Sequence, residues 1–422
     1  MDNHKKIFDN LFKNNITKFQ NYTSKSYEIR NNNEKNSYLP MVQEIRELFG
    51  KKGEIFSESI GTHPDFLKIE NTIEYQYICS LFIDISGSTK LALKYSLDKV
   101  KLYKNAIISS AIEIFRAFDG HIHRIQGDAV LVYFGHQEMK KSDAIINAIN
   151  AASLMQYFND TTLKDFFENK NLEPLKIRIG IDFGDDQSVL WSKYGLDGIN
   201  EITSTSIHTD LASKLQSKAP SNKIMIGENI NKYLDIPKEF RSTKTEKRDG
   251  RVVEKRYILD TSNYGRYSME IFEWENYLDS FSMLSPYSSI NNQYYSPKDF
   301  KIRCWIIDEN QNEYEYIERN NAVEKGKSLR YKLEIYNENL NYNNIKWRVV
   351  NYGKEATMLN ELEFEMVKYE GCQYCNQATA YTGLHFMECY LYDGNDKLIC
   401  KDRFGIYIND NDREVRKLGV ED

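Results

Sequence analysis

The central part of the chain carries apolar patterns that change from strand-like to helix-like and back. Residues 77–84 are apolar on both faces, which is typical of a strand in the middle of a sheet that helices cover. Residues 97–118 place apolar side chains at helical spacing, and the pattern stops at Gly120. Two short strand patterns then flank the turn 126–128, which predicts a β-hairpin over residues 121–134.

The pattern continues with three further elements. Residues 145–155 have an apolar helical face, residues 175–182 form a strand pattern, and residues 205–218 predict another helix. The order β-α-β-β-α-β is that of the split βαβ, or ferredoxin-like, arrangement. We therefore expect an α/β fold, with an antiparallel-containing sheet and helices on one face.

The sequence pattern changes before and after this α/β region. Residues 1–70 predict a helical and loop region, in which residues 8–19 form a short amphipathic helix that we expect to pack against its own protein. Residues 71–260 form the α/β domain. Residues 261–297, rich in Ser, Tyr and Asn, predict a linker, and the alternating patterns of residues 298–422 predict an all-β sandwich.

Composition narrows the possible partners and the compartment. The 422 residues include 56 Lys and Arg against 62 Asp and Glu, a formal charge of -6, which argues against a sequence-independent grip on nucleic acid. A small free anion is a more suitable ligand. Few cysteines and the lack of an apolar stretch long enough for a membrane span or a signal peptide predict a cytoplasmic protein.

Two acidic residues fall at neighbouring strand ends. Asp84 ends the first strand and precedes the turn 85–88, whose backbone N–H groups suit phosphate oxygens. Asp128 lies on the hairpin turn. Carboxylates at one end of adjacent central strands can hold two divalent ions, as displacement at phosphorus requires. Taken singly, each has a plain structural explanation, a helix cap for Asp84 and a tight turn for Asp128.

Taken together, three segments resemble the class III adenylyl and guanylyl cyclases. They are Phe82-Ile-Asp84-Ile-Ser-Gly-Ser-Thr89, Arg124-Ile-Gln-Gly127-Asp128, and Arg178-Ile-Gly180-Ile-Asp-Phe-Gly184. The resemblance implies that residues 71–260 are a cyclase catalytic domain.

The resemblance also implies a metal site. It assigns Asp84, Asp128 and the main-chain carbonyl of Ile85 as ligands of two divalent ions, Mn²⁺ or Mg²⁺. Ser86 and Gly87, in the turn after Asp84, would then bind the substrate phosphates. Both acidic residues count as catalytic in this interpretation.

Family members work as head-to-tail homodimers, so the resemblance implies that the partner chain completes each active site. Arg124 and Thr203 fall at the positions that select the base. Asp210 and Lys214 fall where the family has an Asn and an Arg that orient the ribose and stabilise the phosphates, so the resemblance implies that Lys214 is catalytic and that Asp210 binds the substrate. A lysine can still neutralise charge without the bidentate fork. An Asp to Lys pair four residues apart is equally what an ordinary solvated helix carries.

The expected substrate base follows from one residue that departs from the pattern of the family. Adenylyl cyclases usually place Lys, and guanylyl cyclases Glu, where this chain has Arg124. The longer side chain would shorten the pocket and favour a pyrimidine, and its two prongs suit the adjacent O2 and N3 acceptors of cytosine. We therefore expect CTP to be converted to 3′,5′-cyclic CMP and diphosphate by a phosphorus-oxygen lyase, with cyclic UMP formation as the alternative and adenylate or guanylate cyclisation less favoured.

The C-terminal region extends the resemblance to the whole chain. The segments 347–356 and 383–389 resemble the sensor domain attached to pyrimidine cyclases of bacterial anti-phage signalling, known as the Pycsar type. This implies a cyclic nucleotide that activates a separate effector protein in abortive infection.

Two rival functions stay open. A dinucleotide-forming cyclase carries a Gly-Gly-acidic turn, whereas this turn reads Gln126-Gly127-Asp128. A catalytically silent nucleotide-binding module would account for the altered Asp210 and Lys214, yet it has no need to hold two carboxylates together.

Overall fold

A computed structural model of the chain separates two compact units, and each is described by itself. One contains residues 39–232 and 241–274, and the other contains residues 233–240 and 275–410. The predicted helix over residues 8–19 lies outside the described residues. The structure describes residues 39–67, 73–261, 265–282, 288–290, 293–295 and 299–410.

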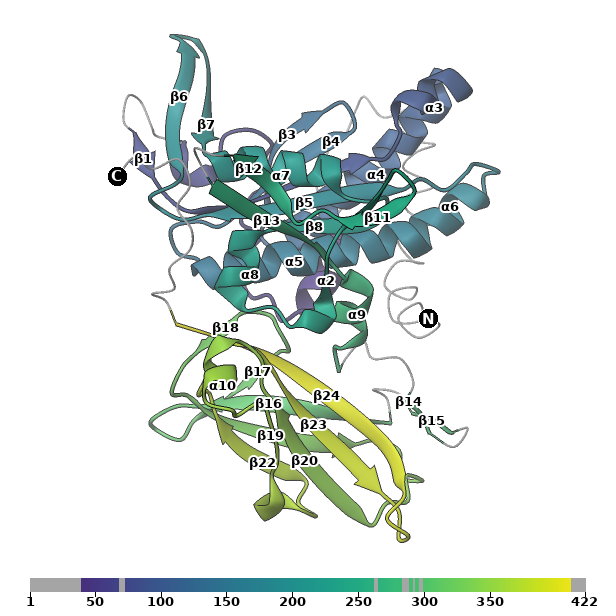
Figure 1. Ribbon diagram of the computed structural model, residues 1–422, viewed down its shortest axis with the longest axis vertical. Coiled ribbons are helices and arrows are strands. Elements are labelled where there is room, and N and C mark those ends of the chain that lie inside the picture. The colour runs from purple at the N-terminus through teal and green to yellow at the C-terminus, as the bar shows by residue number, and fades with distance from the viewer. Residues whose placement is uncertain are drawn as a thin grey trace. The chain divides into compact units, whose positions relative to one another are not determined.

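The first unit is built on an eight-stranded sheet (Figure 1). Its strand order is β12-β13-β8-β5-β2-β4-β3, with β9 paired to β13. Only β5 and β8 run parallel; the other pairs are antiparallel. The strands are β2 (Ile78–Ile85), β3 (His121–Gln126), β4 (Ala129–Phe134), β5 (Ile177–Gly184), β8 (Lys223–Gly227), β9 (Arg241–Ser242), β12 (Tyr257–Thr261) and β13 (Gly265–Phe272).

The order β2-α4-β3-β4-α5-β5 confirms the predicted split βαβ arrangement. The helix α5 is buried on nearly all sides, as expected of a helix that is apolar all round. The prediction that the helices share one face is wrong for α7, which lies on the side of the sheet opposite to α5 (Figure 1). The helices of this unit are α2 (Leu39–Leu48), α3 (Thr89–Lys94), α4 (Leu97–Ala117), α5 (Lys141–Phe158), α6 (Lys164–Glu168), α7 (Ile207–Lys218) and α8 (Glu228–Leu234).

A glycine sets how closely α7 approaches the sheet. A Cβ on Gly180 of β5 would lie 2.1 Å from the backbone nitrogen of Gln216 and 2.3 Å from the carbonyl oxygen of Ala212. Both atoms belong to the backbone of α7, so a side chain at position 180 cannot be accommodated by a rotamer change. Hydrogen bonding between Ser80 of β2 and Thr209 of α7 lies on the same face.

Two smaller sheets complete the unit. β1 (Glu74–Tyr75), β6 (Leu190–Leu196) and β7 (Ile199–Thr205) form one, and β10 (Thr245–Arg248) pairs with β11 (Arg251–Glu254) in the other.

The unit continues past the predicted boundary at residue 260. Residues 265–272 lie in the predicted linker but form β13, which pairs with β8 and buries Tyr267 and Met269. The helix α9 (Trp274–Asp279) follows, and from residue 275 the chain belongs to the other unit. The linker interpretation is therefore wrong for this segment, because its alternating inward side chains belong to the sheet.

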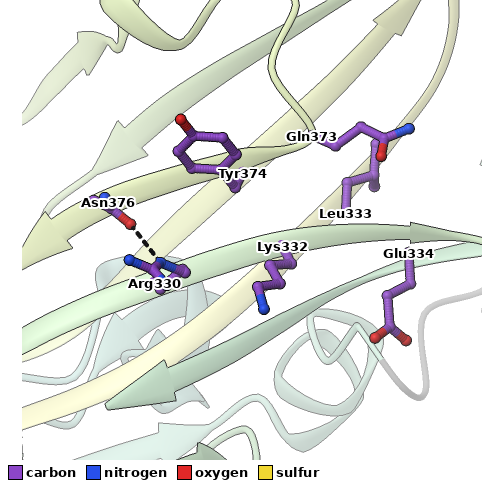
Figure 2. A pocket seen from close by; sticks show the side chains of 7 residues that line it. All are labelled: Arg330, Lys332, Leu333, Glu334, Gln373, Tyr374 and Asn376. Atoms are coloured by element: carbon purple, nitrogen blue, oxygen red, sulfur yellow. Dashed lines mark hydrogen bonds between the residues drawn. The ribbon is translucent and has the colours of Figure 1, made fainter. Parts of the chain in front are cut away.

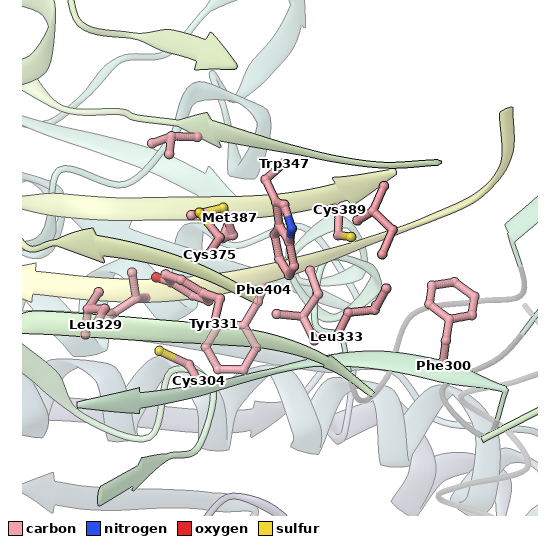
Figure 3. Packing of buried hydrophobic residues seen from close by; sticks show 14 of the residues in the cluster. Phe300, Cys304, Leu329, Tyr331, Leu333, Trp347, Cys375, Met387, Cys389 and Phe404 are labelled. Atoms are coloured by element: carbon pink, nitrogen blue, oxygen red, sulfur yellow. The ribbon is translucent and has the colours of Figure 1, made fainter. Parts of the chain in front are cut away.

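The second unit is the predicted β-sandwich. A four-stranded sheet, β17-β16-β19-β22, and a five-stranded sheet, β18-β24-β23-β20-β21, share one hydrophobic core around Trp347, Tyr331 and Phe404 (Figure 3). The strands are β16 (Phe300–Ile307), β17 (Glu313–Tyr316), β18 (Ala322–Glu324), β19 (Ser328–Ile335), β20 (Asn344–Val350), β21 (Glu363–Glu365), β22 (Tyr374–Ala378), β23 (Gly383–Tyr392) and β24 (Leu398–Asn409). The short helix α10 (Lys354–Met358) follows β20, and β14 (Ser288–Ile290) pairs with β15 (Gln293–Tyr295) before β16.

A buried arginine joins the segment after α9 to this sandwich. The guanidinium of Arg319 donates to the Ser280 carbonyl oxygen at 2.7 Å and to the Glu318 carboxylate at 3.0 Å. Its carbon centre lies 3.8 Å from the ring centroid of Phe281 and 5.2 Å from that of Phe386. Both members of the ion pair are almost fully buried, so the surrounding groups replace their solvation.

Helices long and apolar enough to cross a membrane do not occur in the described part of the chain.

Candidate active site

Asp84 lies at the end of β2 in a partly buried position. Its Oδ2 accepts hydrogen bonds from Arg178 Nη2 at 2.6 Å and from Gln216 Nε2 at 3.1 Å. Burial and the neighbouring Asp128 carboxyl group raise the pKa of Asp84, while Arg178 opposes this shift. Asp84 does not cap a helix, because Ser88 occupies the N-cap position of α3. The plain structural explanation therefore does not account for Asp84.

Asp128 lies on the turn between β3 and β4, directly after Gly127. Gly127 adopts a φ of 68°, so the glycine meets the conformational demand of the turn. The Oδ1 atom of Asp128 is 3.8 Å from Lys104 Nζ, and its Oδ2 is buried without a hydrogen-bond partner. A buried carboxylate oxygen that lacks a partner is costly unless a ligand satisfies it.

These features fit a cation. The Asp84 and Asp128 carboxyl groups interact, and oxygen ligands of this kind suit Mg²⁺ and Mn²⁺. Clusters of three or more His, Cys, Asp or Glu ligands are not found among the residues that the structure describes. A metal ion here would need further ligands from the main chain and the substrate, as is usual for Mg²⁺ beside phosphates.

The turn after Asp84 supplies the main-chain groups. The Ile85 carbonyl oxygen accepts one long hydrogen bond, 3.3 Å, from the Ser88 N–H and keeps a second lone pair. The Ser86 N–H donates to Lys176 O at 2.8 Å, so this group already has a partner. Gly87 has a φ of 76°. Ile85, Ser86 and Gly87 thus lie beside Asp84, but the Ser86 N–H already donates to the Lys176 carbonyl oxygen.

Asp210 and Lys214 lie on the exposed side of α7. They are four residues apart and share a face of the helix. Within the described residues, no ion pair joins the two side chains, so the ordinary solvated pair is not formed. Both side chains are accessible to a ligand or to a partner chain.

Arg124 and Thr203 come together although they lie on different sheets. Thr203 Oγ1 is 3.1 Å from His123 Nε2, and Arg124 Nη2 forms an ion pair with Glu201 Oε2. Glu201 Oε1 is 3.5 Å from His123 Nε2. The predicted base-selecting residues thus belong to one polar group, which we call the β3–β7 cluster (His123, Arg124, Glu201 and Thr203). In the described part of the chain, no hydrogen bond or ion pair links this cluster to Asp84 or Asp128.

Three residues at these sites were not predicted. Arg178 and Gln216 bind Asp84, and Glu201 binds Arg124. The register of β2 and β5, which pairs Asp84 with Arg178, is a signal that a strand alignment could have found. Gln216 and Glu201 carry no such signal, because tertiary packing alone brings them to their partners.

A cavity of about 520 Å³ lies elsewhere, on the β19 and β22 strands of the sandwich (Figure 2). Arg330 there donates to Asn376 and pairs with Glu313, and Lys332 lies 3.6 Å from the same glutamate. The cations of this cavity are therefore neutralised within the protein, and it lacks an acidic pair like that of Asp84 and Asp128.

Comparison with known proteins places both units in families. Residues 71–261 match the adenylate and guanylate cyclase catalytic domain, and residues 273–409 match the adenylyl/guanylyl and SMODS C-terminal sensor domain. The adenylyl cyclase CyaB from P. aeruginosa, a solved structure, covers 48% of this chain with 19% identity and a TM-score of 0.40 over 96% of its own length.

Curated relatives extend over the whole chain. A cytidylate cyclase of Staphylococcus aureus is 81% identical over 100% of both chains. A cytidylate cyclase of Escherichia coli is 33% identical over 91% of this chain and 85% of its own length. The protein therefore belongs to the family of nucleotide cyclases that contains these cytidylate cyclases, with a cyclase catalytic domain followed by a sensor domain.

Proposed function

We propose that this protein is a cytidylate cyclase, which converts CTP to 3′,5′-cyclic CMP and diphosphate. The observation that carries the proposal is the full-length 81% identity to the cytidylate cyclase of Staphylococcus aureus. The paired carboxylates of Asp84 and Asp128 support a catalytic role over a silent binding module, because one buried oxygen of Asp128 has no partner.

The reaction is a single displacement. The ribose 3′ oxygen bonds to the α-phosphorus, the bond from that phosphorus to the bridging oxygen breaks, and diphosphate leaves. The proton of the 3′ hydroxyl passes to solvent. Two divalent ions, Mg²⁺ or Mn²⁺, when bound by Asp84, Asp128 and the Ile85 carbonyl, would stabilise charge on the attacking and leaving oxygens.

The chain's own residues position the nucleotide. Asp84 and Asp128 fix the metal-binding end, and the turn at Ser86 and Gly87 borders the triphosphate. Arg178, beside Asp84, is a fixed cation that offers hydrogen bonds to phosphate oxygens.

The other half of each site comes from a second copy of the chain. In the proposed head-to-tail homodimer, Arg124 and Thr203 of one chain face the base of a nucleotide bound at Asp84 of the other. Asp210 and Lys214 face the ribose and phosphates. The exposure of Asp210 and Lys214, which do not pair with each other, supports this arrangement.

The proposed physiological role is a cytoplasmic second-messenger pathway. Phage infection would be sensed through the sandwich, and cyclic CMP would activate a separate effector protein in abortive infection. The match to a C-terminal sensor domain supports this role.

The test is to incubate the purified protein with each of ATP, GTP, CTP and UTP in the presence of Mn²⁺ and to identify the products by mass spectrometry. Cyclic CMP and diphosphate should dominate. Faster conversion of UTP than of CTP would identify the protein as a uridylate cyclase. Absence of any cyclic product would favour the silent binding module.

A further inference from the structure

The β3–β7 cluster holds the Glu201 carboxylate directly beside Arg124, the residue that the proposed function assigns to the substrate base. Arg124 and Glu201 form an ion pair, and their side chains are 47% and 42% exposed. Both are therefore reachable by a ligand. An exposed pair of this kind contributes little to stability, about 0–1 kcal/mol, so stability alone gives no strong reason for Glu201.

His123 leaves part of Glu201 free. His123 Nδ1 lies 2.8 Å from the Gly61 carbonyl oxygen, which can only accept, so the proton is assigned to Nδ1. Burial lowers the pKa of His123, which keeps the ring neutral. Its Nε2 is then an acceptor, to which the Thr203 hydroxyl donates a hydrogen bond. Since neutral Nε2 cannot donate, the nearby Oε1 of Glu201 keeps its lone pairs for another donor.

The cluster therefore presents donors and acceptors in a defined order. Arg124 offers N–H donors, and Glu201 beside it offers a carboxylate acceptor. The Thr203 hydroxyl already donates its hydrogen bond to His123, so its oxygen can only accept. Cytosine displays the complementary edge, with acceptors at O2 and N3 and an amine donor at N4. Uracil displays N3–H toward the arginine and the O4 acceptor toward the carboxylate.

We propose that Glu201 is a specificity-determining residue, which accepts a hydrogen bond from the N4 amine of cytosine and repels the O4 atom of uracil. A carboxylate that accepts from the cytosine amine is a known form of base recognition. This inference rests on the proposed cytidylate cyclase function and names the group that separates CTP from UTP. Adenine also has an amine beside an acceptor, so the size of the pocket, and not Glu201, excludes it.

The test measures kcat/KM for CTP and for UTP in wild type and in Glu201→Gln. An amide can donate to O4 of uracil, so the ratio of CTP to UTP should fall by at least about tenfold. Glu201→Ala, which removes both the acceptor and the repulsion, should lower the ratio mainly through loss of CTP turnover.

The matched control is Glu254→Gln. Glu254 pairs with Arg256 on the same unit, and the two side chains are 52% and 62% exposed, so its environment resembles that of Glu201. Its ratio of CTP to UTP should equal that of wild type.

Two results overturn the inference alone: an unchanged ratio in an active Glu201→Gln protein, and an equal loss of CTP and UTP turnover in both Glu201 variants, which would make Glu201 a support for Arg124. Wild-type protein that converts no CTP would instead overturn the proposed function, and this inference with it.

Discussion

At the scale of single residues, two carboxylates that share a partly buried site repel each other unless positive charge lies near. Arg178 provides that charge to Asp84, and Lys104 lies at a longer distance from Asp128. One buried oxygen of Asp128 has no hydrogen-bond partner, which supports the proposal that the pair binds a cation. The acidic pair is therefore expected to matter for catalysis more than for folding.

Asp84→Ala and Asp128→Ala should each abolish cyclisation and leave the fold intact. Loss of a proposed metal ligand would remove several kcal/mol of transition-state stabilisation, which predicts a decrease in kcat/KM of at least about a hundredfold. Activity is measured with CTP and Mn²⁺, and circular dichroism reports the fold. Turnover above a tenth of wild type in either variant would contradict the assignment.

His63 predicts a pH dependence of stability. Burial lowers the pKa of His63 to about 3, and its two nitrogens lie near the Gly135 carbonyl oxygen and the Asp65 N–H. The neutral ring is satisfied, whereas the unfolded chain takes up a proton below pH 6.5. The stability that His63 provides is thus complete above pH 6.5 and falls by about 3 kcal/mol on acidification to pH 4.

The check compares denaturation midpoints of wild type and His63→Asn between pH 7.5 and pH 4. The side-chain oxygen of asparagine can still accept the hydrogen bond from the Asp65 N–H, but asparagine does not titrate. The stability advantage of wild type should shrink as the pH falls; a constant difference would show that His63 does not titrate as described.

At the scale of elements, α7 carries Asp210 and Lys214, and its position depends on Gly180. Gly180→Ala would force a Cβ against the α7 backbone and should cost about 3 kcal/mol or more, with a loss of activity as the helix shifts. Gly184→Ala on the same strand is the comparison. Its added Cβ would lie 2.6 Å from Val189 Cγ2, a side-chain atom and not backbone, so a smaller cost is expected. Urea denaturation compares the two variants, and equal stabilities would refute the close-approach argument.

Elements with a regular apolar period could be predicted from the sequence, and those without one were missed. The buried strand at residues 77–84 and the helix at residues 97–118 are long and periodic, and both were found. The β6–β7 hairpin was overlooked although Asp197-Gly198 is a turn signal. The strand β13 was hidden in a segment rich in Ser and Tyr.

The residues of the candidate site could likewise be predicted only where a local sequence pattern marks them. Asp84 and Asp128 could be proposed because each lies in a recognisable motif, Asp84 near the end of a buried strand and Asp128 on a hairpin turn. Glu201 could not, because a lone glutamate in an exposed hairpin looks like any solvated residue until the fold brings β7 to β3. Local sequence patterns predict the helix or strand to which a residue belongs. They do not predict contacts between residues that are far apart in the sequence.

At the scale of the whole molecule, the proposed division of the active site between two chains predicts complementation. Asp84→Ala and Lys214→Ala proteins should each be inactive, and a mixture should regain activity because a heterodimer rebuilds one complete site. Random exchange in an equal mixture makes half of the dimers heterodimers, so about a quarter of wild-type activity is expected. Cyclic CMP formation is measured after subunit exchange is confirmed; no recovery would argue for a site within one chain or against a catalytic Lys214.

The buried arginine of the sandwich bears on where the sensor unit begins. A truncated chain starting at residue 298, the boundary predicted from sequence, would lack Ser280 and Phe281, and Arg319 would keep its charge but lose two of the groups that enclose it. Residues 233–240 belong to the same unit, and Glu239 forms an ion pair with Arg403. The sensor is thus a discontinuous domain, assembled from segments that the cyclase sheet interrupts, and it cannot be excised intact by a single cut.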